Sequence, residues 1–248
     1  MPPVPKPKAA KAGRNRNLFI ALAIAGVVAV ALIAGSIVLS GGGGQDAADT
    51  STETTSSTPG PVALVAGIPQ KGTVLGNPDV NVRMLQFEDI QCPVCKTYTD
   101  DALPAIVDEY VRPGKVKIDF RGLAFVGPDS VKALRISLAA GFQNKLWEVV
   151  GLFYENQGAE NSGWVTDTLV DDILAQVPGL DAEKVKADAA TSAVTSQVVA
   201  TQAQSEKLEV PGTPAFYIGI GAKPVYKIEP RTFDPSEFRP AFDDALGQ

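Results

Sequence analysis

Two cysteines, Cys92 and Cys95, stand three positions apart in a chain of 248 residues that has no other cysteine. An apolar strand pattern over 82–87 precedes them, and a helical pattern over 93–111 begins between them. Two intervening residues let the sulfurs meet over one helical turn, so the pair can close to a disulfide with little backbone movement. The chain must therefore fold so that a buried strand ends where a helix begins.

The start of a helix gives Cys92 a chemical role. The first N–H groups of a helix are unpaired and carry partial positive charge. They stabilise a thiolate, lower its pKa below the usual value of about 8.5, and make Cys92 the attacking sulfur. Cys95 lies one turn further along, and we expect it to be more buried and to resolve the mixed disulfide. Pro93 suits the first helical turn, where its missing N–H costs nothing. The spacing thus predicts a redox-active pair, with Pro93 and Val94 as its intervening residues.

Two other uses of the cysteines stay open at this point. They can form a structural disulfide, although a four-residue loop removes little entropy from the unfolded chain. They can also supply half of a metal site shared between two chains. Two cysteines cannot complete a four-ligand zinc site in one chain that has no histidine. The lack of histidine further excludes Ser-His-Asp and Cys-His catalysis. We expect neither a metal nor a cofactor.

The N-terminal part of the sequence predicts a membrane anchor. Residues 1–17 carry a charge of +5, and the run 18–39 that follows has 22 uncharged residues. As a helix, this run is about 33 Å long at ~1.5 Å per residue, enough to cross a hydrocarbon core of about 30 Å. Because positive flanks stay in the cytoplasm, we expect a single-pass protein of the cell membrane with its N-terminus in the cytoplasm and its folded domain outside it. A cleaved signal peptide and a buried core helix are the alternatives.

The rest of the chain divides into a linker and a folded domain. Residues 40–61 are rich in Gly, Ser, Thr and Asp, which predicts a flexible linker. The folded domain is expected over 72–246. Outside the basic tail, 1–17, the chain has 17 basic and 28 acidic residues. Such an acidic body argues against broad binding of nucleic acid or anionic lipid.

Strand and helix patterns alternate in the folded domain. Strands are expected over 82–87 and 116–120, and a hairpin over 215–228 that turns at residues 221–223. A long helical region, about 129–208, lies before the hairpin. The expected helix signals are a kink at Pro104, a break at Gly141 and Asn144, and N-caps at Asp181 and Asp234.

Three motifs together resemble the DsbA-like branch of the thioredoxin superfamily, and in particular its membrane-tethered, single-pass members. They are the lead-in VLGNP at 74–78, the segment FEDIQCPVC at 87–95 and the loop VPGTP at 210–214. The resemblance covers residues 72–246. It implies an α/β architecture, a thioredoxin fold with an inserted helical domain at about 129–208, preceded by one transmembrane helix.

The separation of the motifs agrees with such an insert. Cys95 and Pro214 lie 119 residues apart, whereas one βαβ crossover needs only about 30 or more. The resemblance also implies that Thr213-Pro214 is a cis peptide bond in a loop that faces the disulfide. Thr213 would then offer its backbone to an extended substrate peptide. The implied partners are exported proteins with cysteine thiols and a membrane protein that re-oxidises the pair with quinone.

Two positions depart from the family pattern. Val94 stands where many DsbA-like enzymes have histidine, so a polarised donor near Cys92 is missing. Gln86 stands six residues before the first cysteine, where the superfamily often places a buried carboxylate that relays a proton. A neutral amide cannot exchange that proton. Water would then do so, or Glu88 if it faces the site; otherwise Glu88 and Asp89 are solvated acids at the end of a strand.

These features lead to three functional hypotheses. The first is an extracytoplasmic thiol–disulfide oxidoreductase that introduces disulfides into exported proteins. The second is a reductase or isomerase of the same fold. The third, from another class, is a non-catalytic binding module of the cell envelope. The redox potential and the effect of replacing each cysteine separate them.

Overall fold

The computed structural model describes residues 59–223 and 225–247. The expected tail, 1–17, the expected membrane helix, 18–39, and most of the expected linker, 40–61, lie outside the described residues. Within the described part of the chain, no helix has both the length and the apolar character needed to cross a membrane.

The described residues form one sheet of six strands in the order β1-β2-β4-β3-β5-β6. Strands β3 and β4 run parallel, and every other neighbouring pair is antiparallel. Both expected strands extend further than predicted: β3 continues through the buried acids Glu88 and Asp89, and β4 continues through the half-buried Arg121 to Leu123. The strands are β1 (Gln70–Lys71), β2 (Val74–Leu75), β3 (Val82–Asp89), β4 (Val116–Leu123), β5 (Ala215–Ile220) and β6 (Tyr226–Ile228).

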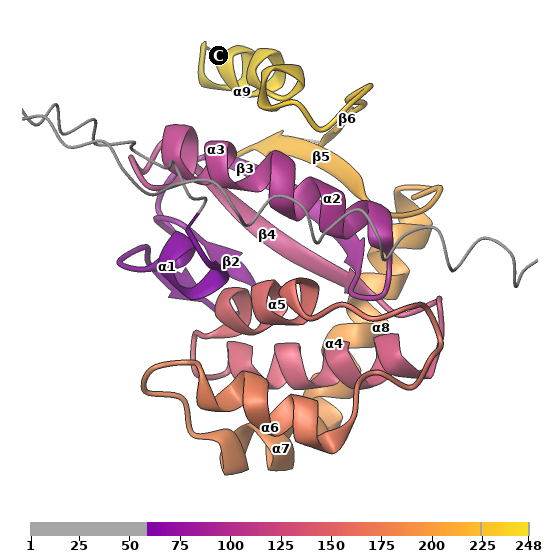
Figure 1. Cartoon of the computed structure of the whole chain (residues 1–248). Coiled ribbons are helices and arrows are strands. Elements are labelled where there is room, and N and C mark those ends of the chain that lie inside the picture. The colour runs from indigo at the N-terminus through magenta and orange to yellow at the C-terminus, as the bar shows by residue number, and fades with distance from the viewer. Residues whose placement is uncertain (1–58, 224, 248) are drawn as a thin grey trace, which may run out of the picture. The chain divides into compact units, whose positions relative to one another are not determined.

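Helices surround this sheet. Five of them, α4 to α8, lie between β4 and β5 in the chain, which confirms the helical insertion. Figure 1 shows α4 to α7 gathered in the lower part of the view, while α9 lies at the top, near β5 and β6. The helices are α1 (Pro61–Val65), α2 (Pro93–Asp101), α3 (Leu103–Ile106) with a π-helical turn (Val107–Val111), α4 (Pro128–Gly141), α5 (Leu146–Glu155), α6 (Asp167–Ala175), α7 (Ala182–Ala189), α8 (Ser192–Lys207), a 3₁₀ turn (Pro235–Glu237) and α9 (Arg239–Gly247). Helix α1 precedes residue 72, where the folded domain was expected to begin.

Local signals account for most helix boundaries. Asn144 has a φ of 57° and separates α4 from α5, as predicted. Asp181 caps α7 by accepting a hydrogen bond from the Lys184 N–H at 2.9 Å. The kink expected at Pro104 is a break at Ala102, two residues earlier, because proline has no N–H to continue the ladder of α2.

Two expected boundaries differ in the structure. The single helix expected after Asp181 is two helices, α7 and α8. Thr191 interrupts it, since its backbone is extended and its hydroxyl donates to the Asp188 carbonyl at 2.6 Å. Asp234 was expected to cap the last helix. It instead caps the short 3₁₀ turn, by accepting from the Ser236 N–H at 2.8 Å, and α9 begins after that turn at Arg239.

The central strand β3 sends alternate side chains to opposite faces of the sheet. Leu85 and Phe87 belong to a small apolar cluster on one face. Met84 belongs to the large core, which includes residues of α2, α5 and α9. Gln86 and Glu88 alternate with the first pair and therefore lie on the α2 face. Because both faces are covered, the strand is buried along almost its whole length.

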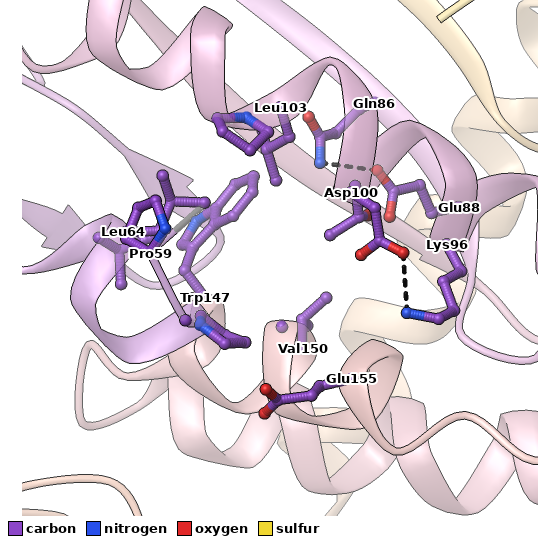
Figure 2. A pocket seen from close by; sticks show the side chains of 16 residues that line it. Pro59, Leu64, Gln86, Glu88, Lys96, Asp100, Leu103, Trp147, Val150 and Glu155 are labelled. Atoms are coloured by element: carbon purple, nitrogen blue, oxygen red, sulfur yellow. Dashed lines mark hydrogen bonds and ion pairs between the residues drawn. The ribbon is translucent and has the colours of Figure 1, made fainter. Parts of the chain in front are cut away.

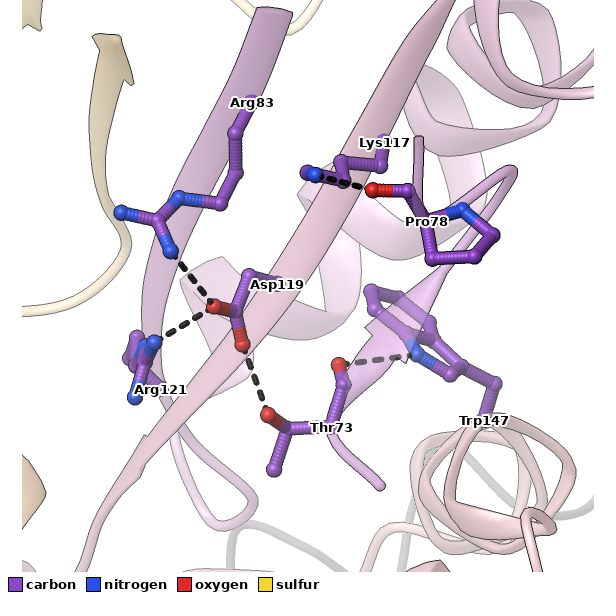
Figure 3. Close-up of polar contacts among 7 residues, drawn as sticks. All are labelled: Thr73, Pro78, Arg83, Lys117, Asp119, Arg121 and Trp147. Carbon is purple, nitrogen blue, oxygen red and sulfur yellow. Dashed lines mark hydrogen bonds and ion pairs between the residues drawn. The ribbon is translucent and has the colours of Figure 1, made fainter. Parts of the chain in front are cut away.

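A buried carboxylate fixes the edge of the sheet beside α5 (Figure 3). Asp119 on β4 is 1% exposed and forms ion pairs with Arg121 and, at 3.7 Å, with Arg83. It also accepts a hydrogen bond from the Thr73 hydroxyl at 2.7 Å. The Thr73 carbonyl in turn accepts from the Trp147 indole N–H at 3.1 Å. Strand β2 and helix α5 are thus held to the same point of the sheet.

Candidate active site

Cys92 is the N-cap residue of α2, and Pro93 occupies its first turn, as the sequence predicts. The Cys92 sulfur accepts a hydrogen bond from the backbone N–H of Cys95 at 3.4 Å. Both cysteines are free thiols in this structure. Cys92 is 8% exposed and Cys95 is fully buried. The order of burial therefore agrees with an attacking first thiol and a resolving second one.

The surroundings of Cys92 favour its thiolate and lower its pKa to about 6. The largest cause is a hydrogen bond from the Cys95 thiol, and the Thr213 side chain and the backbone N–H groups of Cys95 and Val94 add to it. Partial burial acts in the opposite direction. The sequence pointed only to the N–H groups of the helix. The structure shows that the partner thiol contributes more than they do.

Cys95 has the opposite electrostatic surroundings. Burial raises its pKa far above that of a free thiol, and the hydrogen bond with Cys92 and the charge of Glu88 raise it further. At neutral pH the pair therefore carries one thiolate, on Cys92, and one neutral thiol, on Cys95. Release of Cys95 as a thiolate requires a proton soon afterwards.

The loop expected to face the pair does so. The Thr213-Pro214 bond is cis, as predicted. The Cys92 sulfur lies 3.4 Å from the Thr213 carbonyl oxygen, to which the protonated thiol donates. Beside this contact is a groove of about 340 Å³, here called the Thr213 groove. Its lining includes Val94, Pro211, Thr213, Pro214, Lys227 and Phe233.

We expect alkylation of the reduced protein to follow a single thiol with a midpoint near pH 6. Cys92 should react as its thiolate forms, while buried Cys95 should stay unmodified. The measurement is the rate of iodoacetamide labelling between pH 4 and 10, with the labelled site identified by mass spectrometry. Replacing Cys95 by alanine removes the largest stabilising contact, so the midpoint should rise. A wild-type midpoint equal to that of free cysteine would contradict this account of the site.

Glu88 lies inside the protein beneath the pair and is 1% exposed. Its carboxylate accepts hydrogen bonds from the Tyr154 hydroxyl at 2.7 Å and from the Gln86 amide at 2.7 Å. Burial raises the pKa of Glu88 to about 8, with the Tyr154 hydrogen bond acting against it and the charge of Cys92 adding to it. The interpretation of Glu88 as a solvated acid is therefore wrong. It faces α2, on the same side of the sheet as Gln86.

Asp89 is also fully buried, which corrects the same interpretation for this residue. One carboxylate oxygen accepts from the N–H of Gln91 at 2.9 Å and from the Ser130 hydroxyl. The other accepts from the N–H groups of Phe125 at 3.0 Å and Val126 at 3.2 Å. An Asp followed two residues later by a backbone donor is a recognisable turn signal. Asp89 joins the segment before Cys92 to the loop that leads into α4.

Other contacts to the motif come from the helical insert. Gln157, just after α5, donates its amide to the carbonyls of Ile90 at 2.6 Å and Cys92 at 3.2 Å. The Tyr154 hydroxyl lies 3.3 Å from the Asp89 carbonyl. Sequence reasoning missed both residues, since neither belongs to a motif and each lies more than 60 positions away.

Comparisons with known proteins agree with this geometry. The thioredoxin family model matches residues 69–224. A probable disulfide bond formation protein D of Bacillus cereus is 31% identical over 147 residues, which are 58% of this chain and 68% of that protein. The disulfide bond formation protein D of Bacillus subtilis is 27% identical over 147 residues, or 58% of this chain and 66% of that protein.

Solved structures show the same fold. The crystal structure of oxidised BdbD from Bacillus subtilis has a TM-score of 0.61 and 24% identity, over 73% of this chain and 98% of that one. A thioredoxin-like oxidoreductase from Silicibacter pomeroyi DSS-3 has a TM-score of 0.53 and 27% identity, over 71% and 92%. With a cysteine pair at the start of a helix and a cis-proline loop against it, the chain belongs to the thioredoxin family, in its DsbA-like branch, and is a thiol–disulfide oxidoreductase.

Proposed function

We propose that this oxidoreductase introduces disulfides into exported proteins, with Cys92 as the exchanging sulfur and Cys95 as the resolving one. The observation that carries the proposal is the asymmetry of the pair. Cys92 has a pKa lowered to about 6 and contacts Thr213, which lines an open groove, whereas Cys95 is fully buried. Only one of the two sulfurs can therefore meet a substrate.

The reaction proceeds in two exchanges that balance. A substrate thiolate attacks Cys92 in the oxidised pair, which forms a mixed disulfide and releases Cys95 as a thiolate that takes up a proton. A second substrate thiolate then attacks the substrate sulfur of the mixed disulfide and releases Cys92. Because a leaving thiol departs faster when its pKa is low, the surroundings of Cys92 speed this second step. The substrate is released with a new disulfide, and the cysteine pair of the enzyme is left reduced.

The Thr213 groove is the proposed binding place for the substrate segment around the reacting thiol. The Thr213 carbonyl lies next to the Cys92 sulfur, so an extended peptide that pairs with this backbone brings its own sulfur to Cys92. Val94 is 49% exposed at the edge of the groove and offers apolar contact. Such a surface suits unfolded chains, which expose apolar side chains together with their free thiols.

The proposal places the enzyme outside the cytoplasm, anchored by residues 18–39. The support comes from the sequence: a long uncharged run with basic residues only on its N-terminal side. The proposal further includes a membrane partner that removes electrons from the reduced pair and passes them to quinone. The relatives named as disulfide bond formation proteins support this direction of electron flow.

A redox titration of the purified domain tests the direction of the reaction. Lowering the pKa of Cys92 from 9.0 to about 6 stabilises the reduced form at pH 7 by about 1.4 kcal/mol, or about 30 mV. This shift moves the potential in the oxidising direction, and the proposed oxidase requires a potential above about −220 mV, well above that of thioredoxin at about −270 mV. Position 94 is valine, where many DsbA-like enzymes have histidine, and this favours the second candidate, a reductase or isomerase. A potential below about −220 mV would establish that candidate and refute the oxidase.

A further inference from the structure

A cavity of about 190 Å³ lies between α1, α2 and α5. In Figure 2, Gln86 and Glu88 face Leu64 and Trp147 across it. The wall on the side of α5 includes Val150. Volume alone gives room for several waters, since each water occupies about 30 Å³ in the liquid.

The cavity joins a buried carboxyl to the surface. Glu88 is 1% exposed, yet it lines this cavity together with polar residues from the helices above it. Lys96 and Asp100, on the outer turns of α2, pair with each other at 2.8 Å, and Asp100 is exposed. Glu155, at the end of α5, is exposed as well. Water in the cavity would thus have polar partners at both ends, as an ordered water requires.

The groups around Glu88 come from three elements. Helix α2 contributes the thiols of Cys92 and Cys95, the Tyr98 hydroxyl, and the paired Lys96 and Asp100; α5 contributes the Tyr154 hydroxyl and the exposed Glu155; and β4 places Gly122 opposite Glu88. None of the ion pairs described for residues 59–223 and 225–247 involves Glu88. Its proton is therefore held by burial, which outweighs the Tyr154 hydrogen bond, and no ion-paired cation displaces it.

Gln86 holds Glu88 in place. The Tyr98 hydroxyl donates to the Gln86 amide oxygen at 3.1 Å, which turns the amide nitrogen toward Glu88 at 2.7 Å. The neutral amide at position 86 cannot exchange a proton, but two residues further along the same face of β3 a carboxyl group can. The acid that the superfamily often has at position 86 is thus replaced by Glu88, two residues further along β3 on the face that α2 covers.

We propose that Glu88 is the proton relay for Cys95 and that the cavity behind it is the path by which solvent protons reach Glu88. The inference rests on the proposed exchange at Cys92. When the pair is opened by a substrate thiolate, the Cys95 thiolate takes the proton of the neutral Glu88 carboxyl. The Glu88 carboxylate then recovers a proton from solvent through the cavity. In the reverse direction Glu88 accepts the Cys95 proton, and Cys95 attacks the mixed disulfide.

The reverse step gives a direct test. The protein is reduced, Cys92 is joined to glutathione, and the release of glutathione by Cys95 is followed by stopped flow between pH 5 and 10. Because general acid–base catalysis contributes about 10²–10⁴-fold, Glu88→Gln should slow release at least tenfold at pH 7 and abolish the inflection near pH 8. Glu148→Gln is the matched control, since Glu148 is a buried acid of α5, 5% exposed, that does not line this cavity.

Two further variants test the path itself. Val150→Phe narrows the cavity and should slow glutathione release, whereas Val150→Ala widens it and should not. Neither should change the alkylation of Cys92, because Val150 does not touch it in the described contacts. Equal release rates in Val150→Phe and the wild type would overturn the cavity as the path.

A measurement on the unaltered protein covers the case in which a variant fails to fold. Infrared difference spectra of the reduced protein between pH 6 and pH 10 should contain the band of a neutral carboxyl group, because the relay requires a Glu88 that is protonated near neutral pH and releases its proton near pH 8. A spectrum without such a band, or a Glu88→Gln variant that releases glutathione at the wild-type rate, would overturn Glu88 as the relay. A wild type that never releases glutathione would instead refute the proposed exchange.

Discussion

Cys95→Ser is expected to convert the protein into a trap that stays joined to its substrates through Cys92. Serine cannot resolve a mixed disulfide, while the lowered pKa of Cys92 keeps it ready to exchange. Disulfide formation in a reduced substrate should fall to the uncatalysed rate. The measurement is the appearance of reducible, high-mass adducts on non-reducing gels from cells, with the partners identified by mass spectrometry.

Cys92→Ser is the matched control. It should abolish turnover equally but form no adducts, since the remaining Cys95 is fully buried. The pair of variants also tests the non-catalytic binding module. If Cys95→Ser accumulated no adducts and Cys92→Ser kept its biological function, the cysteines would have no part in that function and the enzyme hypothesis would fail.

Glu88→Gln should make the folded protein more stable, and increasingly so as the pH rises. In the unfolded chain Glu88 ionises near its ordinary pKa of 4.5, but in the folded protein only at about 8. Between these values the unfolded state gains free energy from ionisation that the folded state does not, so the wild type loses stability as the pH rises. The loss is at most about 5 kcal/mol, at about 1.36 kcal/mol per pKa unit. A neutral glutamine avoids it.

The measurement is urea denaturation of the reduced protein at pH 4, 6 and 8. The wild type and the variant should have similar free energies of unfolding at pH 4. At pH 8 the free energy of unfolding of the variant should be higher by several kcal/mol. Glu148→Gln should bring no such gain, because it removes a carboxylate paired with Lys145 at 3.3 Å and hydrogen-bonded to Gln70 at 2.7 Å. A constant difference between wild type and Glu88→Gln at all three pH values would show that folding does not change the pKa of Glu88.

The sequence was most informative where the signals are local. The strand before Cys92, the helix after it and the break at Asn144 each follow from a few neighbouring residues. The cis bond before Pro214 and the helical insertion followed from the resemblance to a known family. These predictions are confirmed by the structure.

The surroundings of the acids could not be predicted in the same way. Glu88 and Asp89 follow an apolar run, where acids commonly meet solvent. What buries and satisfies them is Tyr154, 66 positions from Glu88, and Ser130, 41 positions from Asp89. No local pattern announces such contacts. The same holds for Gln157, whose sequence neighbours show no motif.

The hydrogen bonds from Gln157 and Tyr154 to the backbone carbonyls of Asp89, Ile90 and Cys92 have a consequence for comparing relatives. The backbone beside the pair is held in part by residues that lie outside the four-residue motif. Two proteins that share CPVC but differ in these helices can therefore hold the pair differently. Evolution can adjust such an enzyme to a new compartment without touching the residues that react.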